Sequence, residues 1–147
     1  AGHIALWCGL ANGAEEVLLP EKYDYDEQRL IDQVVNARKN GKQNYIIINA
    51  EGIGHSQSMA KRIEEATRIE TRATILGHMH RGGSPTCKDR VYATTMGAMA
   101  VDLLCEGKSN RVIAHKGGAF VDFDIDEALA MKKGVDEYMY QISKSLV

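Results

Sequence analysis

The chain has 147 residues and a mass of 16.2 kDa, the size of one ordinary domain. Apolar residues make up 44% and charged residues 26%, which is typical of a globular protein and excludes the disordered and collagen-like classes. Its net charge of −2 gives it no general attraction to nucleic acid or anionic lipid, so we expect neither as a partner.

The pattern of apolar residues predicts helices and strands in alternation. A helix is expected over residues 4–11, ending near Gly13, and a strand over residues 16–19, stopped by Pro20. The other expected helices lie at 30–37 (closed by Asn40 and Gly41), 59–66, 86–106, after Asp124 and at 135–146; the other expected strands lie at 45–49, 71–76, 111–114 and 119–123. Such alternation predicts an α/β fold with a mostly parallel sheet and helices on both faces.

Two expected strands end next to residues that could bind a ligand. Glu51 follows the strand at 45–49, and His78 follows the strand at 71–76. Ligands of open α/β sheets bind outside the carboxyl ends of the strands, so Glu51 could accept hydrogen bonds from hydroxyl groups. A solvated loop position, or a charge at a helix start, is an equally good interpretation of Glu51.

The segment 78–85 predicts a phosphate site. His78, His80 and Arg81 precede a glycine-rich turn, and Ser84 with Pro85 is the expected start of the next helix. Backbone N–H groups at a helix start attract anions, and the guanidinium of Arg81 matches a phosphate. A structural turn is the alternative; a metal site is disfavoured because no third ligand is evident.

The remaining candidates come from single residues. Arg72 lies on an expected strand, where nothing nearby in the sequence suggests a partner, and Glu15 could cap or pair. Three widely spaced cysteines without a C-x-x-C motif indicate free thiols, and therefore a reducing, cytoplasmic location. No apolar run approaches the ~18 residues of a membrane helix.

The run ETRATILGHMHRGGSP at 70–85, followed by Asp89 and Arg90, closely resembles the signature of bacterial ATP-dependent 6-phosphofructokinase. The resemblance extends over nearly the whole chain, including GHIAL at 2–6, AEG at 50–52 and YQISK at 140–144. It corresponds to the C-terminal half of the family sequence, with a phosphofructokinase-like, Rossmann-type three-layer fold. The family transfers the γ-phosphoryl group of ATP to fructose 6-phosphate in glycolysis.

The resemblance implies a role for each matching residue. Glu51 would bind the sugar hydroxyls, His78 and Arg81 the 6-phosphate with Met79 and His80 between them, and Arg72 a neighbouring subunit's ligand in a homotetramer. An effector site for ADP, which activates, and phosphoenolpyruvate, which inhibits, would include Gly13, Ala14, Glu15, Asn40, Lys42, Gln43 and Asn44. Two departures from the family pattern are His80 in place of the usual glutamine and Asn40 near a position that is usually lysine, and they bear mainly on the effector response.

The resemblance also implies what this half does not supply. The ATP loop, the catalytic base and most contacts to ATP and Mg²⁺ belong to the other half of the family sequence, so this half alone is expected to be inactive. Residues 1–79 and 132–147 would form the smaller domain, and 80–131 would complete the larger one. Two alternatives remain: a pyrophosphate-dependent phosphofructokinase, and a non-catalytic module that binds a phosphorylated metabolite.

Overall fold

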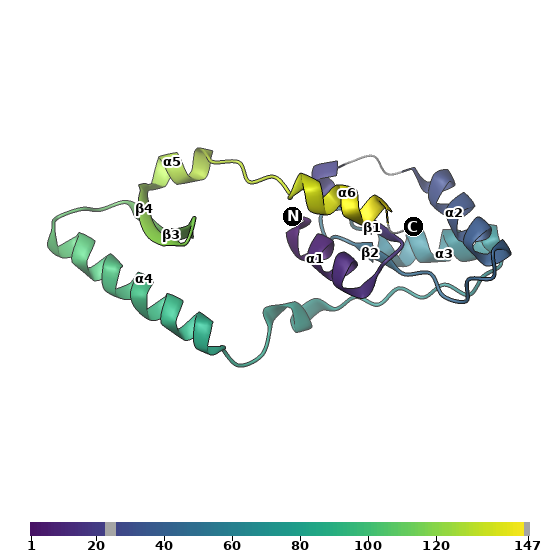
Figure 1. Ribbon diagram of the computed structural model, residues 1–147, viewed down its shortest axis with the longest axis horizontal. Coiled ribbons are helices and arrows are strands. Elements are labelled where there is room, and N and C mark those ends of the chain that lie inside the picture. The colour runs from purple at the N-terminus through teal and green to yellow at the C-terminus, as the bar shows by residue number, and fades with distance from the viewer. Residues whose placement is uncertain (23–25, 146–147) are drawn as a thin grey trace. The chain divides into compact units, whose positions relative to one another are not determined.

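The computed structural model describes residues 1–22 and 26–145, and its contacts divide the chain into two units. The first unit is Ala1–Ile75 with Gly134–Val147, and the second is Leu76–Lys133. Figure 1 labels the helices and strands of both units. The assignment of 1–79 and 132–147 to a smaller domain, and of 80–131 to a larger one, stays a prediction.

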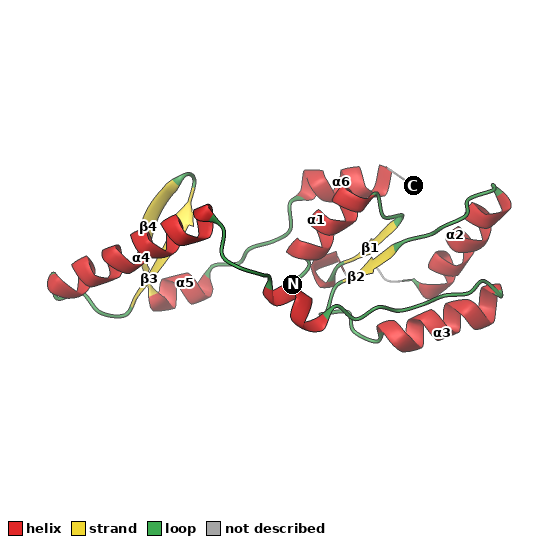
Figure 2. Cartoon of the chain, turned by 90° about the horizontal axis from the view of Figure 1, so that it is seen from below, coloured by secondary structure: helices red, strands yellow, loops and turns green. Residues whose placement is uncertain are grey.

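The first unit is built on a parallel pair of short strands. β1 (Glu16–Leu18) and β2 (Ile47–Asn49) are connected through α2 (Glu27–Lys39), which makes a βαβ unit. Figure 2 shows α1 (His3–Asn12) and α6 (Glu137–Ser145) on one side of this pair, and α2 with α3 (Ser56–Thr67) on the other. A short 3₁₀ helix, η1 (Pro20–Lys22), follows β1. These helix, sheet and helix layers confirm the predicted α/β class.

The core forms on both faces of β1 because successive side chains of a strand point in opposite directions. Val17 and Leu19 contribute to a cluster completed by α1 and α6, whereas Leu18 contributes to a cluster completed by α2 and α3. The buried members of the first cluster are Leu6, Ala14, Val17, Leu19 and Tyr140, and those of the second are Leu18, Leu30, Met59 and Ile63.

Two glycines fix how α1 meets the sheet. Gly9 lies against β1 so closely that a Cβ at this position would be 2.3 Å from Cγ2 of Val17. Gly13 ends the helix in the left-handed conformation, with φ of 62°, as its place after the apolar run predicts. The chain then turns directly into β1, and Glu15 precedes the first strand residue.

The second unit contains a 3₁₀ helix, a long α-helix and an antiparallel hairpin. Its elements are η2 (Gly77–Arg81), α4 (Cys87–Cys105), β3 (Arg111–Lys116), β4 (Ala119–Asp124) and α5 (Ile125–Ala130). Gly117 and Gly118 connect the strands with φ of 59° and 86°, which suits a tight hairpin turn. Tyr92 of α4 packs against the rings of His115 and Phe120 from the hairpin, with centroids 4.6 and 5.2 Å away.

Three sequence predictions of local structure need correction or qualification. Residues 71–76 form no strand, because this segment pairs with no other strand in the described part of the chain. The cap of α4 is Thr86 rather than Ser84: its Oγ1 accepts from the Asp89 N–H while the Asp89 carboxylate accepts from the Thr86 N–H, so two end donors are satisfied. The last helix ends at Ser145, and the predicted end at residue 146 lies outside the described residues.

Candidate functional site

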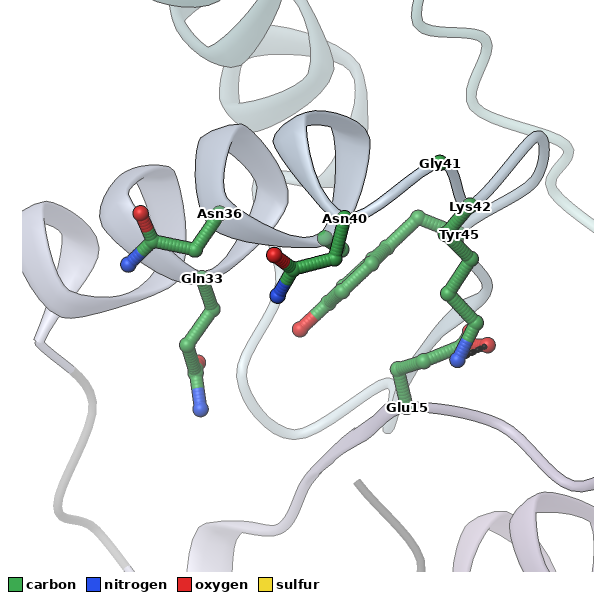
Figure 3. A pocket seen from close by; sticks show the side chains of 8 residues that line it. Glu15, Gln33, Asn36, Asn40, Gly41, Lys42 and Tyr45 are labelled. Carbon is green, nitrogen blue, oxygen red and sulfur yellow. Dashed lines mark ion pairs between the residues drawn. The ribbon is translucent and has the colours of Figure 1, made fainter.

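A pocket of about 550 Å³ opens in the first unit where β1 and β2 begin. It lies at the amino ends of the strands, since Glu15 directly precedes β1 and Lys42 and Tyr45 precede β2. The C-terminal half of α2 supplies the facing wall (Figure 3). The residues that line the pocket are Glu15, Gln33, Asn36, Ala37, Asn40, Gly41, Lys42 and Tyr45.

An ion pair forms the charged part of the pocket. The ammonium group of Lys42 lies 2.7 Å from Oε1 of Glu15, and Oε2 of Glu15 accepts a 2.5 Å hydrogen bond from the Ile46 N–H. Burial by itself raises the pKa of the Glu15 carboxyl, but the hydrogen bonds from Lys42 and Ile46 outweigh it, so the pKa lies below its ordinary value. The carboxylate is therefore ionised at neutral pH and holds Lys42 at the pocket.

The register of the sheet keeps these two groups together. Glu16 pairs with Ile47 in the ladder, and the N–H groups of Glu15 and Glu16 both donate to the Ile46 carbonyl. Glu16 is also buried, and it pairs with Arg29 of α2 at 3.8 Å and with Lys144 of α6. Ion pairs of Glu16 therefore link the start of β1 to α2 on one side of the sheet and to α6 on the other.

The wall from α2 carries neutral hydrogen-bonding groups. Gln33, Asn36, Ala37 and Asn40 follow the spacing i, i+3, i+4 and i+7, which places them on one face of the helix. Figure 3 shows the Asn36, Asn40 and Gln33 side chains on this side of the pocket, with the Tyr45 ring between them and the Glu15–Lys42 pair. Gly41, with φ of 85°, turns the chain from the helix end toward Lys42.

Two buried atoms of pocket-lining residues have no hydrogen-bond partner in the described part of the chain: Oε1 of Gln33 on α2, and the hydroxyl of Tyr45, which precedes β2. Burial, together with the negative charges of Glu16 and Glu15, raises the pKa of Tyr45 to about 12. The phenol is therefore protonated at neutral pH and able to donate. A donor and an acceptor are therefore buried without a partner near the ion pair.

The pocket brings together Glu15, Asn40 and Lys42 of the seven residues predicted for an effector site. The other four lie elsewhere: Gly13 is the exposed end of α1, Ala14 is in the core, Gln43 hydrogen-bonds Arg38 and the Gly41 carbonyl, and Asn44 is exposed. Sequence reasoning missed Gln33, Asn36, Ala37, Gly41 and Tyr45. The polar stripe at helical spacing on α2 was the available signal.

The residues predicted for a sugar phosphate are exposed and belong to both units. Glu51 lies in the turn after β2, in the first unit. His78, Met79, His80 and Arg81 form the 3₁₀ helix η2 of the second unit, and residues 82–86 separate them from α4. Arg72 has a local partner, contrary to expectation, since it donates to Oε1 of Glu70 at 2.8 and 2.5 Å. Both side chains are exposed, so the pair competes weakly with a ligand.

Residues 1–22 and 26–145 contain no cluster of three or more His, Cys, Asp or Glu side chains that could hold a metal ion. A search of the same residues found no helix with the length and apolar character needed to cross a membrane. Cys8, Cys87 and Cys105 are free and exposed, as their number and spacing predict.

Comparisons with known proteins agree with the resemblance found in the sequence. A family model described as phosphofructokinase matches residues 1–104. The chain is 48% identical over 145 residues to an ATP-dependent 6-phosphofructokinase of Clostridium botulinum, and 49% identical over 146 residues to one of Bacillus thuringiensis. These alignments cover 99% of this chain but only 45% and 46% of the two relatives.

A solved structure supports the fold. Phosphofructokinase from Saccharomyces cerevisiae superposes with a TM-score of 0.73 at 24% identity, over 99% of this chain and 23% of that chain. The layered α/β architecture is therefore that of a phosphofructokinase. This chain belongs to the phosphofructokinase family, and it spans about half the length of the bacterial relatives it matches.

Proposed function

We propose that this protein is an ATP-dependent 6-phosphofructokinase, which transfers the γ-phosphoryl group of ATP to fructose 6-phosphate and yields fructose 1,6-bisphosphate. One observation carries the proposal: 99% of the chain aligns at 48–49% identity with two bacterial proteins that bear this name. The chain would supply the sugar-phosphate site and an effector site. The protein would act in the cytoplasm as a homotetramer.

In the sugar-phosphate site, Arg81 and His78 would hold the 6-phosphate, with Met79 and His80 between them. Arg81 is exposed on η2, and its planar guanidinium can donate two parallel hydrogen bonds to a phosphate. Glu51, exposed in the turn after β2, would accept from sugar hydroxyls. Arg72 would reach a neighbouring subunit's ligand by exchanging its exposed contact with Glu70 for a phosphate.

The effector site would take ADP or phosphoenolpyruvate at the pocket of the first unit. Lys42 would bind the ligand's phosphate while Glu15 holds the ammonium group in place. Gly13, Ala14, Asn40, Gln43 and Asn44 would complete the site, and three of the seven residues already line one pocket. Glu15 lies after α1, whereas Asn40 and Lys42 lie after α2, yet all three line the same pocket. This agreement supports the proposal.

The division of labour follows from the chemistry of phosphoryl transfer. Such reactions depend on positioning the acceptor and neutralising charge around the transferred group. The residues of this chain would position the acceptor sugar through its phosphate and hydroxyls. ATP, Mg²⁺ and the catalytic base are assigned mainly to the part of the family sequence that this chain does not span. In this assignment, residues 1–79 and 132–147 form the smaller domain.

The reaction itself is the first test. A complete protein, in which this chain is joined to the part of the family sequence that it does not span, is expected to convert fructose 6-phosphate to the bisphosphate with ATP and Mg²⁺, measured by coupled release of ADP. Turnover with pyrophosphate but not ATP would replace the proposal with a pyrophosphate-dependent enzyme. Binding of phosphorylated metabolites without turnover on either donor would identify a non-catalytic module instead.

The substitution Arg81→Ala tests the sugar-phosphate site. Because a charged bidentate contact contributes roughly 1.5–3 kcal/mol, KM for fructose 6-phosphate should rise about 10- to 100-fold while KM for ATP stays nearly constant. The matched control is Arg90→Ala, which removes an exposed arginine of α4 that has no proposed role. Equal KM values for the sugar phosphate in both variants would refute the assignment of Arg81.

A further inference from the structure

A side-chain bridge closes the loop that carries Glu51. The amide nitrogen of Asn49, the last residue of β2, donates to the Gly54 carbonyl and to the Ser56 hydroxyl, each at 2.8 Å. The reverse orientation of the amide would place Oδ1 against the Gly54 carbonyl oxygen, and two acceptors cannot hydrogen-bond. The Asn49 bridge, meaning these two hydrogen bonds, therefore spans the loop from the end of β2 to the start of α3.

Other contacts restrain the same loop close to Glu51. The Ala50 N–H donates to the Leu18 carbonyl of β1 at 3.0 Å, and Ala50 is 4% exposed. The Ile53 N–H donates back to the Ala50 carbonyl at 3.0 Å, and the Ile53 side chain packs against the core cluster formed with α2 and α3. Glu51 is thus an exposed residue on a turn whose two ends are anchored.

The loop keeps this conformation at a local cost. His55 adopts φ of 55° and ψ of 19°, in the left-handed region that residues other than glycine rarely occupy. Oδ1 of Asn49 is buried without a hydrogen-bond partner among residues 1–22 and 26–145, which also costs free energy. Strained backbone and unsatisfied polar groups cluster at functional sites, so these two costs point to a role for the loop.

We propose that Asn49 is a positioning residue for the sugar-phosphate site, and that it acts by holding the backbone of Glu51 in place. The inference rests on the role proposed for Glu51, whose carboxylate would accept from the sugar hydroxyls. It adds to that role a residue that touches no ligand, because the Asn49 side chain is half-buried and its amide nitrogen is directed into the loop by the Asn49 bridge.

The Asn49 bridge keeps the loop ordered before a ligand binds. A ligand that has to order a flexible loop loses part of its binding free energy to conformational entropy, whereas a loop that is already ordered avoids this loss. Removing the bridge should therefore weaken only those ligand contacts that Glu51 makes. The phosphate contacts assigned to Arg81 belong to η2 of the other unit, and they should be unaffected.

The test measures binding of fructose 6-phosphate by equilibrium dialysis, in a complete protein that joins this chain to the part of the family sequence that it does not span. Asn49→Ala should raise the dissociation constant about 5- to 10-fold. In a Glu51→Ala background the same substitution should change it less than about 2-fold, because the bridge acts only through Glu51. In an Arg81→Ala background the full effect of Asn49→Ala should persist.

Two further variants separate positioning from folding. Asn12→Ala is the matched control, since it removes a side-chain amide that donates to a backbone carbonyl at 2.9 Å at the end of α1, and it should leave fructose 6-phosphate binding unchanged. Ser56→Ala removes one acceptor of the Asn49 bridge and keeps the bond to Gly54, so this variant should fold as well as the parent protein. It should raise the dissociation constant about 2- to 3-fold, and only when Glu51 is present.

Each outcome decides the inference. It is overturned if Asn49→Ala and Ser56→Ala bind fructose 6-phosphate like Asn12→Ala, or if their effects are the same with and without Glu51. The kinase assay on the same preparations tests the proposed function separately. Turnover with binding that does not depend on the Asn49 bridge would reject only the role of Asn49, whereas bridge-dependent binding without turnover would reject only the kinase. A parent protein that neither binds nor phosphorylates the sugar phosphate would reject both.

Discussion

Replacing Gly9 by alanine should destabilise the first unit, although alanine is the better helix former. A Cβ at Gly9 would lie 2.3 Å from Cγ2 of Val17, well inside the ~3.5–4.0 Å of a normal carbon contact. Val17 is 3% exposed and β-branched on a strand, so it has little freedom to move. The overpacking should lower the free energy of unfolding by about 2–3 kcal/mol. The better helix propensity of alanine offsets about 1 kcal/mol of this, so the net loss is about 1–2 kcal/mol.

Urea unfolding provides the assay. Because Trp7 on α1 is 68% exposed, the transition is followed by far-ultraviolet circular dichroism rather than by tryptophan fluorescence. A double-mutant cycle with Val17→Ala isolates the clash, because removing the two methyl groups of Val17 should relieve it and give a coupling of about 1 kcal/mol or more. Gly97→Ala on α4, where a Cβ would meet nothing within 4 Å, should instead be neutral or stabilising. Strict additivity in the cycle, or a stabilising Gly9→Ala, would refute the reasoning.

Two further predictions concern charge. The pKa of Glu15 lies below its ordinary 4.5 in the folded state, so its contribution to stability is present above about pH 4.5 and is lost as the pH falls through the lowered value. Glu15→Gln should therefore lower the urea midpoint at pH 7, and the difference should shrink as the pH falls below 4.5; a gap independent of pH would contradict this account. Asp89→Ala breaks the capping box with Thr86 and should lower the midpoint of thermal unfolding followed by circular dichroism. Asp102→Ala, at an exposed interior position of the same helix, is the control and should change stability by less than about 0.5 kcal/mol.

The elements predicted well from the sequence are those that local chemistry determines. The apolar spacing of α1 and the glycine after it specify both the helix and its left-handed end at Gly13. The strands predicted at 111–114 and 119–123 are likewise present, as β3 and β4. In each case the signal and the structure depend on residues within a few positions of one another.

Predictions failed where the outcome depends on a distant partner or on competing local options. Residues 71–76 have the composition of a strand, but a strand forms only with a neighbour that pairs with it, and the described residues supply none. Ser84 and Thr86 are both acceptable helix caps in sequence. Thr86 prevails because Asp89 lies three residues after it and completes the reciprocal hydrogen bonds.

The sequence predicted the charged residues of the candidate site, Glu15 and Lys42, but not the neutral residues that line the rest of the pocket. Glu15 and Lys42 were found through resemblance to a family, not through physical reasoning, which looked to the carboxyl ends of the strands. The pocket opens instead at the amino ends. Tyr45 reads as part of a buried strand in the sequence, and only its position opposite α2 makes it a lining residue.

The βαβ connection explains why the wall and the charged pair face each other. β1 and β2 are parallel, so the segments that precede them lie at the same end of the strands, the amino end. Helix α2 returns the chain from the carboxyl end of β1 to that amino end. A ligand that contacts both Lys42 and the α2 face would therefore bind the folded unit and not the unfolded chain, since the wall and the pair come from separate segments. Its binding should raise the apparent stability of the first unit by RT ln(1 + [L]/Kd), about 2.7 kcal/mol at 100 times the dissociation constant. This added stability should appear in the urea unfolding transition followed by circular dichroism, and Lys42→Ala should abolish it.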